Sequence, residues 1–425
     1  MTYEEAQAYI REKNLLGSVL GLDNIKELLK RLGEPQNKVK VVHIAGTNGK
    51  GSILACIDAV LRDAGYKVGR YISPTIFCYL ERFQVNGKYM EETAFAEYLT
   101  AVATVVEGMK AEGYVVTAFE IETALAFLYF YEIGVDMVLL ETGMGGRLDA
   151  TNVVDKPVCT ILASISMDHM NILGNTVEQI TYEKCGILRE GVPCVSYPQT
   201  DRVRKVIEEY CGLHNVGLIL PECKELTMEK SDLEHEIFDY KKVKYELGLL
   251  GEYQIYNAIT AIEALDVINS YLKATENIAL EKVNMQRGLH NVKWEGRFEI
   301  LCRNPYVIRD GAHNLDAAIQ LRNQLIKHFT NKRIIYIIGV LGDKEHQKML
   351  SVLGPLAQKA YAITVPDNTR ALPAECLAEE LKSYIEDVVI AHSPEEALDA
   401  AVKEADASDV IVAFGSLYYI GKIGA

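Results

Sequence analysis

VKVVHIAGTNGKGS, residues 39–52, is the stretch of sequence that decides the fold. Its apolar first half predicts a buried strand, and its glycines predict a loop whose backbone N–H groups surround an anion. Lys50 adds a positive charge to this loop, and Ser52 adds a hydroxyl that can ligate Mg²⁺. The helix expected to begin here directs its positive end at the same phosphates.

This loop departs from a strict Walker A motif at two points. Ile44 stands five positions before Gly49, and Gly51 separates Lys50 from Ser52. A glycine turn between a strand and a helix is also a common structural device that needs no ligand. The combination of strand, glycine loop and embedded lysine nevertheless favours phosphate binding.

Length and composition describe a globular enzyme of two domains. The chain has 425 residues, which exceeds one usual core. Its apolar share of 49% and charged share of 24% are ordinary for a soluble protein. The net charge of −15 argues against nucleic acid or an anionic membrane as a partner. A negatively charged small substrate stays possible, because local lysines and arginines can still attract it.

Cysteine usage and the N-terminal segment predict a cytoplasmic protein. The nine cysteines include no CxxC pair, which fits free thiols in a reducing compartment. The first residues, MTYEEAQAYIREKN, are charged and helical and lack the apolar core of a signal peptide. Apolar runs of membrane-spanning length are absent from the sequence.

Short apolar runs alternate with helical patterns through the first part of the chain, which predicts a mostly parallel α/β sheet. The expected strands are Val39–Ile44, Val68–Ile72, Val135–Leu140, Val158–Ile165 and Val192–Val195, and the expected helices include Ile53–Ala64 and Phe119–Glu132. Interleaved apolar and charged residues from Leu218 to Leu249 predict a small antiparallel excursion at the edge of this sheet. Helical spacing returns over Glu252–Leu272.

Periodicity lapses near His290–Arg297 and then restarts as a βα repeat, which predicts a second, smaller Rossmann-like domain. Its expected strands are Val307–Arg309, Ile334–Val340, Ala360–Thr364, Val388–Ala391 and Val410–Phe414. The predicted fold class is therefore α/β, with a P-loop-containing, mostly parallel domain over residues 1–293 and a Rossmann-like domain over 297–425. An active site is expected in the cleft between them.

Several motifs at predicted strand ends or the hinge carry polar groups that could reach this cleft. Glu141, in ETGMGGRLDATN (141–152), is placed to hold Mg²⁺ opposite Ser52, or is a solvated loop acid. His169, in SMDH (166–169), is by itself more typical of a structural histidine than of a ligand. A lysine such as Lys184, inside a predicted helix, is ordinarily a surface charge.

The second domain contributes two further motifs. Arg297, at the hinge, could stabilise phosphoryl oxygens across the cleft or form an interdomain salt bridge. In DGAHN (310–314), Asn314 is a plausible helix cap, a role that leaves Asp310 and His313 able to face the cleft.

These motifs stand in the order found in one known family. GTNGKGS, ETGMGGRLDATN, SMDH, EKCGI, GRFE, DGAHN, GVLGDKE and FGSLYYIG follow one another along essentially the whole chain. The sequence thereby resembles the folylpolyglutamate and dihydrofolate synthases, a branch of the Mur ligase superfamily. The resemblance implies an ATP-dependent ligase that phosphorylates a carboxylate of a folate or dihydropteroate, after which L-glutamate attacks the acyl phosphate.

The resemblance also implies a role for each matching residue. The nucleotide would be held by Thr47, Asn48, Gly49, Lys50, Gly51, Ser52, Asn257, Arg297 and Asp310. Ser52 and Glu141 would bind one Mg²⁺, and Glu141 and His169 a second. Lys184 matches a lysine that CO₂ carbamylates, which turns a cation into a metal-positioning anion. His313 would lie near the γ-phosphate and glutamate, and together with Lys50, Lys184 and His169 it completes the expected catalytic set.

The folate side of the resemblance contains two departures. Ser73, Pro74 and Arg82 match the pterin-binding segment, but Thr75 replaces the usual histidine. Arg309 replaces the usual aliphatic residue before Asp310, so its charged head needs a partner or solvent. The family expectation for the oligomeric state is a monomer.

Two other functions compete with this one. A peptidoglycan-precursor ligase of the same superfamily would have a loop ending Gly-Lys-Thr/Ser without Gly51, and an additional UDP-binding domain. A P-loop regulatory protein without ligase chemistry would tolerate the loss of His169, Lys184 and His313, yet all three are present.

Overall fold

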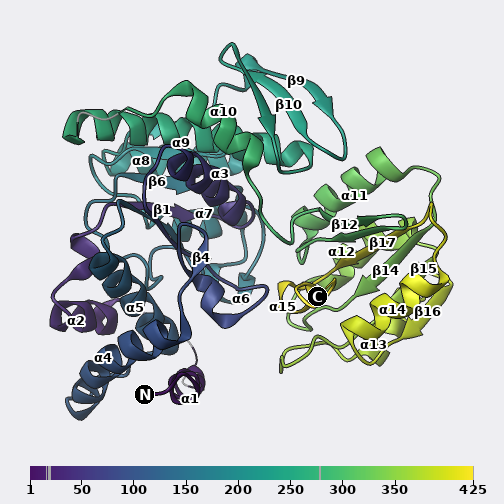
Figure 1. Ribbon diagram of the computed structural model, residues 1–425, viewed down its shortest axis with the longest axis horizontal. Coiled ribbons are helices and arrows are strands. Elements are labelled where there is room, and N and C mark those ends of the chain that lie inside the picture. Colours follow the sequence, from purple (N-terminus) through teal and green to yellow (C-terminus); the bar gives the residue numbers. More distant parts are fainter. Residues whose placement is uncertain (16, 18–20, 277–278, 425) are drawn as a thin grey trace.

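Two lobes, each built on its own sheet, make up the protein (Figure 1). The computed structural model describes residues 1–15, 17, 21–276 and 279–424. Within these residues the larger lobe holds an eight-stranded sheet of order β4-β3-β2-β5-β1-β6-β7-β8, and the smaller lobe a six-stranded sheet of order β12-β13-β17-β14-β15-β16. A third, three-stranded sheet of order β11-β10-β9 lies beside the large lobe. The α/β class with a parallel-rich first sheet is confirmed.

The large sheet is parallel from β2 to β8 and antiparallel at its other edge. Its strands are β1 (Val41–Ala45), β2 (Val68–Tyr71), β3 (Phe83–Val85), β4 (Lys88–Tyr89), β5 (Met137–Glu141), β6 (Cys159–Leu162), β7 (Cys194–Ser196) and β8 (Leu218–Ile219). β1 pairs with β5 on one side and β6 on the other, so GTNGKGS leaves the centre of the sheet at its carboxyl edge. That edge is where α/β sheets bind ligands.

Helices cover both faces of the large sheet, which explains why its central strands β1, β5 and β6 are buried at every position and mostly apolar. On one face Val42 and Ile44 of β1 pack with α3, α9 and α10, and on the other Val41 packs with α1, α2, α4 and α5. The helices of this lobe are α1 (Tyr3–Asn14), α2 (Asp23–Arg31), α3 (Lys50–Asp63), α4 (Glu92–Ala111), α5 (Ala118–Ile133), α6 (Met170–Leu173), α7 (Val177–Cys185), α8 (Asp201–Leu213), α9 (Glu252–Glu276) and α10 (Lys282–Asn291).

The antiparallel excursion expected from Leu218 begins later than predicted. β8 pairs in parallel with β7 and belongs to the large sheet. The separate antiparallel sheet consists of β9 (Leu226–Ser231), β10 (Glu236–Tyr240) and β11 (Val243–Leu247). Alternate residues of β10 and β11 are buried with the core that includes α9, which accounts for the interleaved pattern in the sequence.

The small lobe follows the predicted βα repeat with one added strand. Its strands are β12 (Glu299–Arg303), β13 (Tyr306–Arg309), β14 (Ile334–Ile338), β15 (Lys359–Ala362), β16 (Asp387–Ile390) and β17 (Val410–Phe414), and its helices are α11 (Leu315–Phe329), α12 (His346–Leu353), α13 (Ala374–Leu381), α14 (Pro394–Glu404) and α15 (Leu417–Ile420). β12, which the sequence analysis did not predict, pairs antiparallel with β13. Its partly exposed residues give no continuous apolar run to detect.

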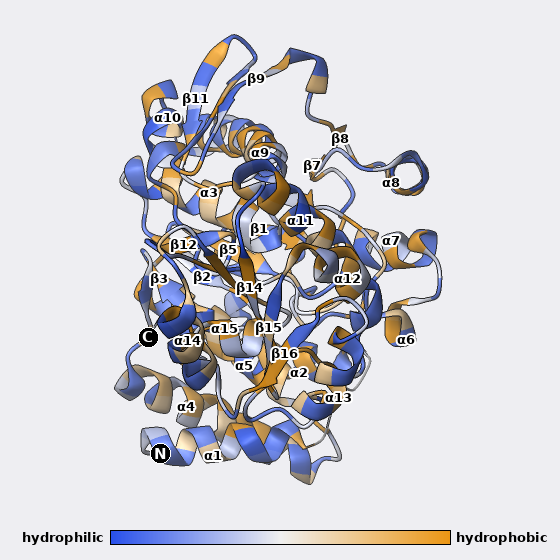
Figure 2. Cartoon of the chain, turned by 90° about the vertical axis from the view of Figure 1, so that its right-hand side faces the viewer, coloured by the Kyte–Doolittle hydropathy of each residue, from blue (hydrophilic) through white to orange (hydrophobic). Residues whose placement is uncertain are grey.

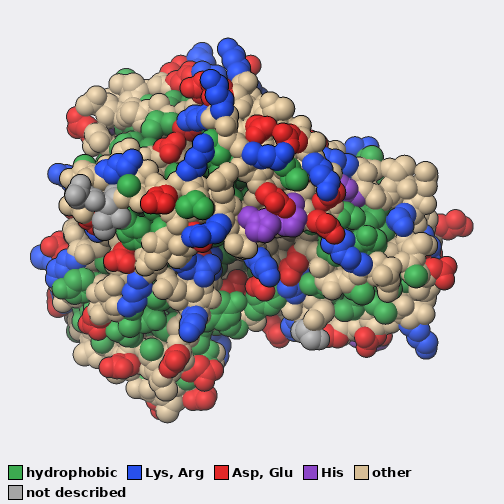
Figure 3. Space-filling model, turned by 45° about the horizontal axis from the view of Figure 1, so that its top comes forward, with side chains coloured by type: hydrophobic (Ala, Val, Ile, Leu, Met, Phe, Trp, Pro, Cys, Tyr) green, Lys and Arg blue, Asp and Glu red, His purple; other side chains and the backbone are tan. Residues whose placement is uncertain are grey.

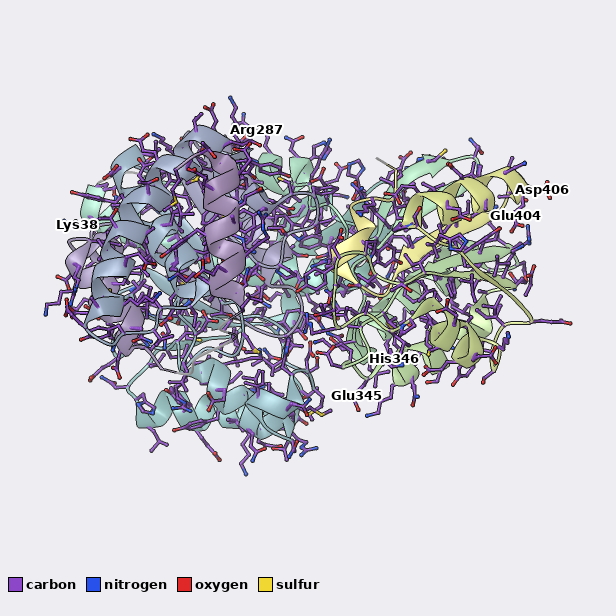
Figure 4. All side chains as sticks on the ribbon, turned by 90° about the horizontal axis from the view of Figure 1, so that it is seen from below. Lys38, Arg287, Glu345, His346, Glu404 and Asp406 are labelled. Carbon is purple, nitrogen blue, oxygen red and sulfur yellow. The ribbon has the colours of Figure 1, made fainter. Side chains whose placement is uncertain are left out.

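Hydropathy follows this architecture. In Figure 2 the strands inside both lobes are mostly orange, while the outer helices carry blue faces. Figure 4 shows how far the two lobes extend the molecule, with Lys38 at the far end of the large lobe and Asp406 at the far end of the small one. All nine cysteines are free thiols. Among the described helices, none is long and apolar enough to cross a membrane.

Candidate active site

A cavity of about 380 Å³ lies between the two lobes, at the carboxyl edge of the large sheet. Its volume is within the usual range of small-molecule sites. Its lining includes these residues singled out from the sequence: Thr47, Asn48, Gly49, Lys50, Gly51, Ser52, Ser73, Pro74, Glu141, His169, Lys184, Asn257, Arg297, Asp310 and His313. A second cavity of about 690 Å³ shares Ser73, Pro74, His169 and His313 with the first and adds Arg82. The structure therefore brings the predicted site residues into one cleft.

The phosphate loop is closely packed at two of its glycines, Gly49 and Gly51. Gly49 caps α3 in the left-handed region, with φ of 85°, and a Cβ there would lie 2.6 Å from the Asn257 side chain. At Gly51 a Cβ would lie 2.6 Å from the ring of Trp294. Glycine is therefore required at Gly49 by backbone conformation, and at both positions by close approach. Gly51, the additional glycine that departs from the Walker A motif, is therefore explained by its close packing against Trp294.

Two lysines meet on one backbone carbonyl inside the loop. Lys50 Nζ donates to the carbonyl oxygen of Gly46 over 3.3 Å, and Lys184 Nζ donates to the same oxygen over 2.9 Å. Burial and, after it, the positive charge of Lys50 lower the pKa of Lys184 to about 7. The Lys184 side chain is therefore partly neutral at neutral pH, unlike an ordinary surface lysine.

Glu141 ends β5 and faces the loop from the neighbouring strand. Its carboxylate lies 3.5 Å from Lys50 Nζ. Burial raises the pKa of Glu141, and the charges of Lys50 and Arg297 partly offset that rise. Ser52, on the first turn of α3, is almost fully buried and lines the same cavity. A hydroxyl and a carboxylate at one cavity wall are suitable oxygen ligands for Mg²⁺.

Asp168 connects the two lobes. Its carboxylate accepts a hydrogen bond from Lys344 Nζ of the small lobe, and the Nε2 atoms of His169 and His313 each lie 3.9 Å from it. Burial alone would raise the pKa of Asp168, but the charges of its neighbours lower it more, so this carboxylate stays ionised.

The two histidines beside Asp168 are uncharged at neutral pH. Burial lowers the pKa of His169 to about 4, and that of His313 to about 4 as well. His313 Nδ1 lies 2.8 Å from the carbonyl oxygen of Gly311, which can only accept, so Nδ1 carries the proton. The Nε2 atom of His313 is therefore left with a free lone pair.

The small lobe presents Arg297 and Asp310 beside each other. Asp310 directly follows β13, and its two oxygens accept hydrogen bonds from the backbone N–H groups of Phe298 (2.7 Å) and Ala312 (2.8 Å). Burial raises the pKa of Asp310, and the charge of Arg297 opposes that rise. Arg297 Nη1 donates to the Gly296 carbonyl over 3.0 Å. The arginine lines the cavity and forms no ion pair within the described residues, so the interdomain salt bridge considered from the sequence is not observed.

A second set of contacts joins the lobes through the phosphate loop. The Asn48 side chain donates to Asn314 over 3.2 Å and to Asp316 over 2.8 Å, and it accepts from Asn314 over 3.0 Å. Asn314 also caps α11 through the backbone N–H of Ala317, as its position predicted. The cap and the interlobe contact are therefore made by the same side chain.

The second cavity contains the segment that departs from the family pattern. Thr75 and Arg82 line it, and Arg82 forms an ion pair with Glu122 of α5 while stacking over Tyr79 at 4.9 Å. Arg309, the other departure, lies outside the described lining of both cavities. It makes a bidentate ion pair with Glu299 over 2.7 and 2.9 Å, which supplies the partner that its charge requires.

Sequence reasoning missed Asp168 and Lys344 as site residues. Asp168 was visible in SMDH and Lys344 in GVLGDKE, but neither motif alone shows that the two pair across 176 positions. Trp294, which covers Gly51, was seen only as part of the hinge.

Two family models match the chain. The Mur ligase middle domain matches residues 44–265, and the Mur ligase glutamate ligase domain matches residues 296–417.

Known proteins match over nearly the whole chain. The dihydrofolate synthase/folylpolyglutamate synthase of Bacillus subtilis is 35% identical over 436 residues, covering 99% of this chain and 98% of that protein. The folylpolyglutamate synthase of Lacticaseibacillus casei is 31% identical over 432 residues, covering 100% and 98%. Among solved structures, E. coli FolC in complex with DHPP and ADP superimposes with a TM-score of 0.85 at 29% identity, covering 98% of this chain and 96% of that one.

Proposed function

The chain belongs to the Mur ligase family, among its folylpolyglutamate and dihydrofolate synthases, and from this premise we propose how its cleft performs their reaction. It is an ATP-dependent ligase that adds glutamate to a folate. The observation that carries the proposed mechanism is one cavity lined by the phosphate loop, Lys184, Glu141 and His169 from the large lobe, and by Arg297 and His313 from the small lobe.

ATP is proposed to bind with its phosphates in the loop from Thr47 to Ser52. The backbone N–H groups and Lys50 would hold the phosphates, and the start of α3 directs its positive end at them. Asn257, Arg297 and Asp310 would hold the rest of the nucleotide, with Arg297 close enough to the cavity to face the phosphates. The complex of the similar E. coli protein with ADP supports the binding of an adenine nucleotide.

Mg²⁺ is proposed to bind at Ser52 and Glu141, and a second ion at Glu141, His169 and Lys184. Buried oxygen groups beside the phosphate loop fit this assignment, and the neutral imidazole of His169 can donate a lone pair. When bound, the ions offset charge on the transferred phosphoryl group.

Lys184 is proposed to be carbamylated. A neutral amine attacks CO₂, forms a C–N bond and releases one proton, which leaves a carbamate anion. A pKa near 7 supplies that neutral amine, and the burial of Lys184 protects the product from water. The modification would also replace one of two positive charges on the Gly46 carbonyl with a negative charge suited to a metal.

The reaction needs a dry cavity, since water would hydrolyse the acyl phosphate. The folate or dihydropteroate carboxylate attacks the γ-phosphorus and ADP leaves. The glutamate amine then attacks the acyl carbon and phosphate leaves. The Asp168–Lys344 and Asn48–Asp316 contacts hold the lobes together around this chemistry. His313 is proposed to accept a proton from the attacking amine at Nε2, and the free lone pair on that atom supports this role.

The pterin end of the substrate is proposed to occupy the second cavity, against Ser73, Pro74 and Arg82. In the same proposal the catalytic lobe comprises residues 1–293 and the Rossmann-like lobe residues 297–425, supported by separate sheets in the two parts. We further propose that the protein is a monomer and that it is cytoplasmic. The free cysteines support a reducing compartment.

The experiment is product mass analysis after incubation with Mg²⁺-ATP and L-glutamate. Dihydropteroate and tetrahydrofolate are supplied in separate reactions. Addition of one glutamate to dihydropteroate identifies a dihydrofolate synthase, serial additions to tetrahydrofolate identify a folylpolyglutamate synthase, and both products identify a bifunctional enzyme. ATP hydrolysis at the same rate without either acceptor would reject the ligase mechanism.

A further inference from the structure

Two histidines and a glutamate meet on the large lobe, away from the cleft. His235 lies in the turn between β9 and β10, Glu246 on β11, and His290 near the end of α10. One ligand atom from each of the three lies within 4.8 Å of the others. Figure 3 shows a patch of histidine side chains beside acidic ones near the junction of the lobes. The family motifs described above do not include these residues.

The distances in this cluster match a metal site. His235 Nδ1 lies 3.2 Å from one oxygen of Glu246, and His290 Nδ1 lies 3.4 Å from the other. Neighbouring ligands of a tetrahedral ion with bonds of about 2.0–2.1 Å are separated by about 3.3 Å. The imidazole rings stack at 5.0 Å with an interplanar angle of 13°. The His235 side chain is 34% exposed and that of His290 45% exposed, so an ion can reach them from solvent.

Backbone contacts fix the three residues relative to one another. Antiparallel pairing sets Ile237 opposite Glu246, which places the start of β10 beside β11. The N–H of Gly248 donates to the carbonyl of Leu289 over 3.0 Å, which joins β11 to α10. A Cβ at Gly248 would lie 2.7 Å from the His290 carbonyl, so the two backbones are in close contact. Backbone contacts alone therefore hold the β9–β10 turn, β11 and α10 next to one another, so the three side chains are close together before any ion binds.

The chemistry of the ligands selects the class of ion. Two imidazoles and one carboxylate suit a divalent transition ion such as Zn²⁺, and leave a fourth position for water. Mg²⁺ prefers oxygen ligands and is a poor match for two imidazoles. We propose that His235, Glu246 and His290 form a binding site for a zinc-class divalent ion, distinct from the magnesium sites of the cleft.

This site would act as a clamp between the small sheet and the hinge. Leu233, two residues before His235, packs against the core of the small lobe, and its carbonyl accepts from Arg303 over 2.8 Å. His290 lies on α10 just before the chain passes through Trp294 into the small lobe. An ion joining these segments restrains the turn at Leu233 and the hinge together.

The test is a Co²⁺ titration of the metal-free full chain, followed by visible absorption. The expected result is one saturable ion whose four-coordinate d–d bands appear without thiolate charge-transfer absorption and disappear on adding Zn²⁺. Glu246→Gln and His290→Gln should each remove this component. Ions bound in the cleft contribute equally to wild type and variants, so the difference isolates the cluster.

The chain offers a matched control. His346, labelled in Figure 4, pairs with Glu380 over 3.0 Å and has one histidine and one carboxylate instead of three ligands. His346→Gln should leave the Co²⁺ component unchanged. Equal titrations and spectra in wild type, Glu246→Gln and His290→Gln would overturn the site, because the three side chains would then form ion pairs alone.

Hydrogen exchange tests the clamp separately. Zn²⁺ should slow exchange at the Glu234 and His235 amides in wild type and not in His290→Gln. Both amides already donate to Asp232, over 2.8 and 3.0 Å. The turn is therefore ordered without Zn²⁺, and the measurement is the further slowing of exchange that Zn²⁺ causes. Saturable binding without added protection would overturn the clamp.

Discussion

The two walls of the cleft are built differently. On the large-lobe wall the charged groups are fixed by contacts within that lobe, such as those of Lys50 and Lys184 with Gly46. The small-lobe wall holds Arg297 and Asp310 in the same way, but it also makes contacts that cross the gap, from Lys344 to Asp168 and from Asn314 to Asn48. If the loop binds phosphates as proposed, the large-lobe wall is preformed for them, and the small lobe completes the site when the lobes meet.

Replacing Lys50 should have the largest effect, because the preformed wall then loses its phosphate cation. Lys50→Ala should lower kcat/KM by about a thousandfold. Among the described contacts its amine reaches only the Gly46 carbonyl and the Glu141 carboxylate, both at the cavity wall, so thermal unfolding should stay close to that of wild type. Steady-state ADP release and a melting curve measure the two properties. A collapsed fold, or activity within tenfold of wild type, would contradict a preformed phosphate site.

Lys184 gives the next largest effect and a dependence on pH. Lys184→Ala should lower activity by about a hundredfold, with partial recovery on adding short carboxylates. In the wild-type enzyme a lysine with a pKa of about 7 is protonated below that pH and neutral above it. The reactive amine therefore grows from about a tenth to about nine tenths of the total between pH 6 and 8.

Protein freed of CO₂ should consequently regain activity faster at pH 8 than at pH 6 when dissolved CO₂ is restored at equal concentration. Lys348→Ala, which removes an exposed lysine paired with Glu345 on the small lobe, is the matched control and should reactivate like wild type. A reactivation rate that does not change over this pH range would remove the carbamate from the mechanism.

The sequence predicts those features of the large-lobe wall whose residues are contiguous in the chain, and it does not predict those that depend on tertiary packing. The strand, loop and helix around Gly46–Ser52 are contiguous, so periodicity and glycine chemistry identify them. The burial of Lys184 was not predictable from its helix, because only the packing of α7 against Gly146 shows that this lysine faces inward. Its assignment came from the family resemblance alone.

The small-lobe wall was harder to predict because its contacts are distant in sequence. Asp168 and Lys344 pair across 176 positions, and a single sequence carries no signal for such a pair. The strands β3, β4 and β12 were missed for a related reason. β3 and β4 have only three and two residues, β4 and β12 are exposed or partly exposed, and the pairing of all three depends on neighbours rather than on their own hydropathy. The parallel strands at the centre of both sheets are buried throughout and mostly apolar, and they were predicted.

Removing the Lys344–Asp168 ion pair tests whether the small lobe completes the site through contacts that cross the gap. Lys344→Met should lower kcat/KM by roughly tenfold, equivalent to about 1.4 kcal/mol, because the lobes then meet without this ion pair. Since Asp168 also loses a neighbouring positive charge, the loss should exceed that of Asn48→Ala, which removes only neutral and carboxylate hydrogen bonds. Steady-state kinetics with nucleotide and acceptor varied separately measures both variants. A thousandfold loss would show that Lys344 acts on the reacting phosphate rather than on closure.

The smallest effect on activity is expected at Arg309, beside the small-lobe wall but outside the lining of its cavities. Arg309→Leu restores the aliphatic residue usual in the family, and activity should stay within about twofold because Asp310 keeps its two backbone donors. Stability should fall by about 1–3 kcal/mol, since Glu299 loses a bidentate partner and retains the Gly296 N–H. Denaturant unfolding measures this loss, and Glu299→Gln in the same background should recover part of it if the remaining charge is the cause. A tenfold loss of activity in Arg309→Leu would instead mean that the Arg309–Glu299 pair positions Asp310, so that both walls of the cleft would depend on contacts inside their own lobe.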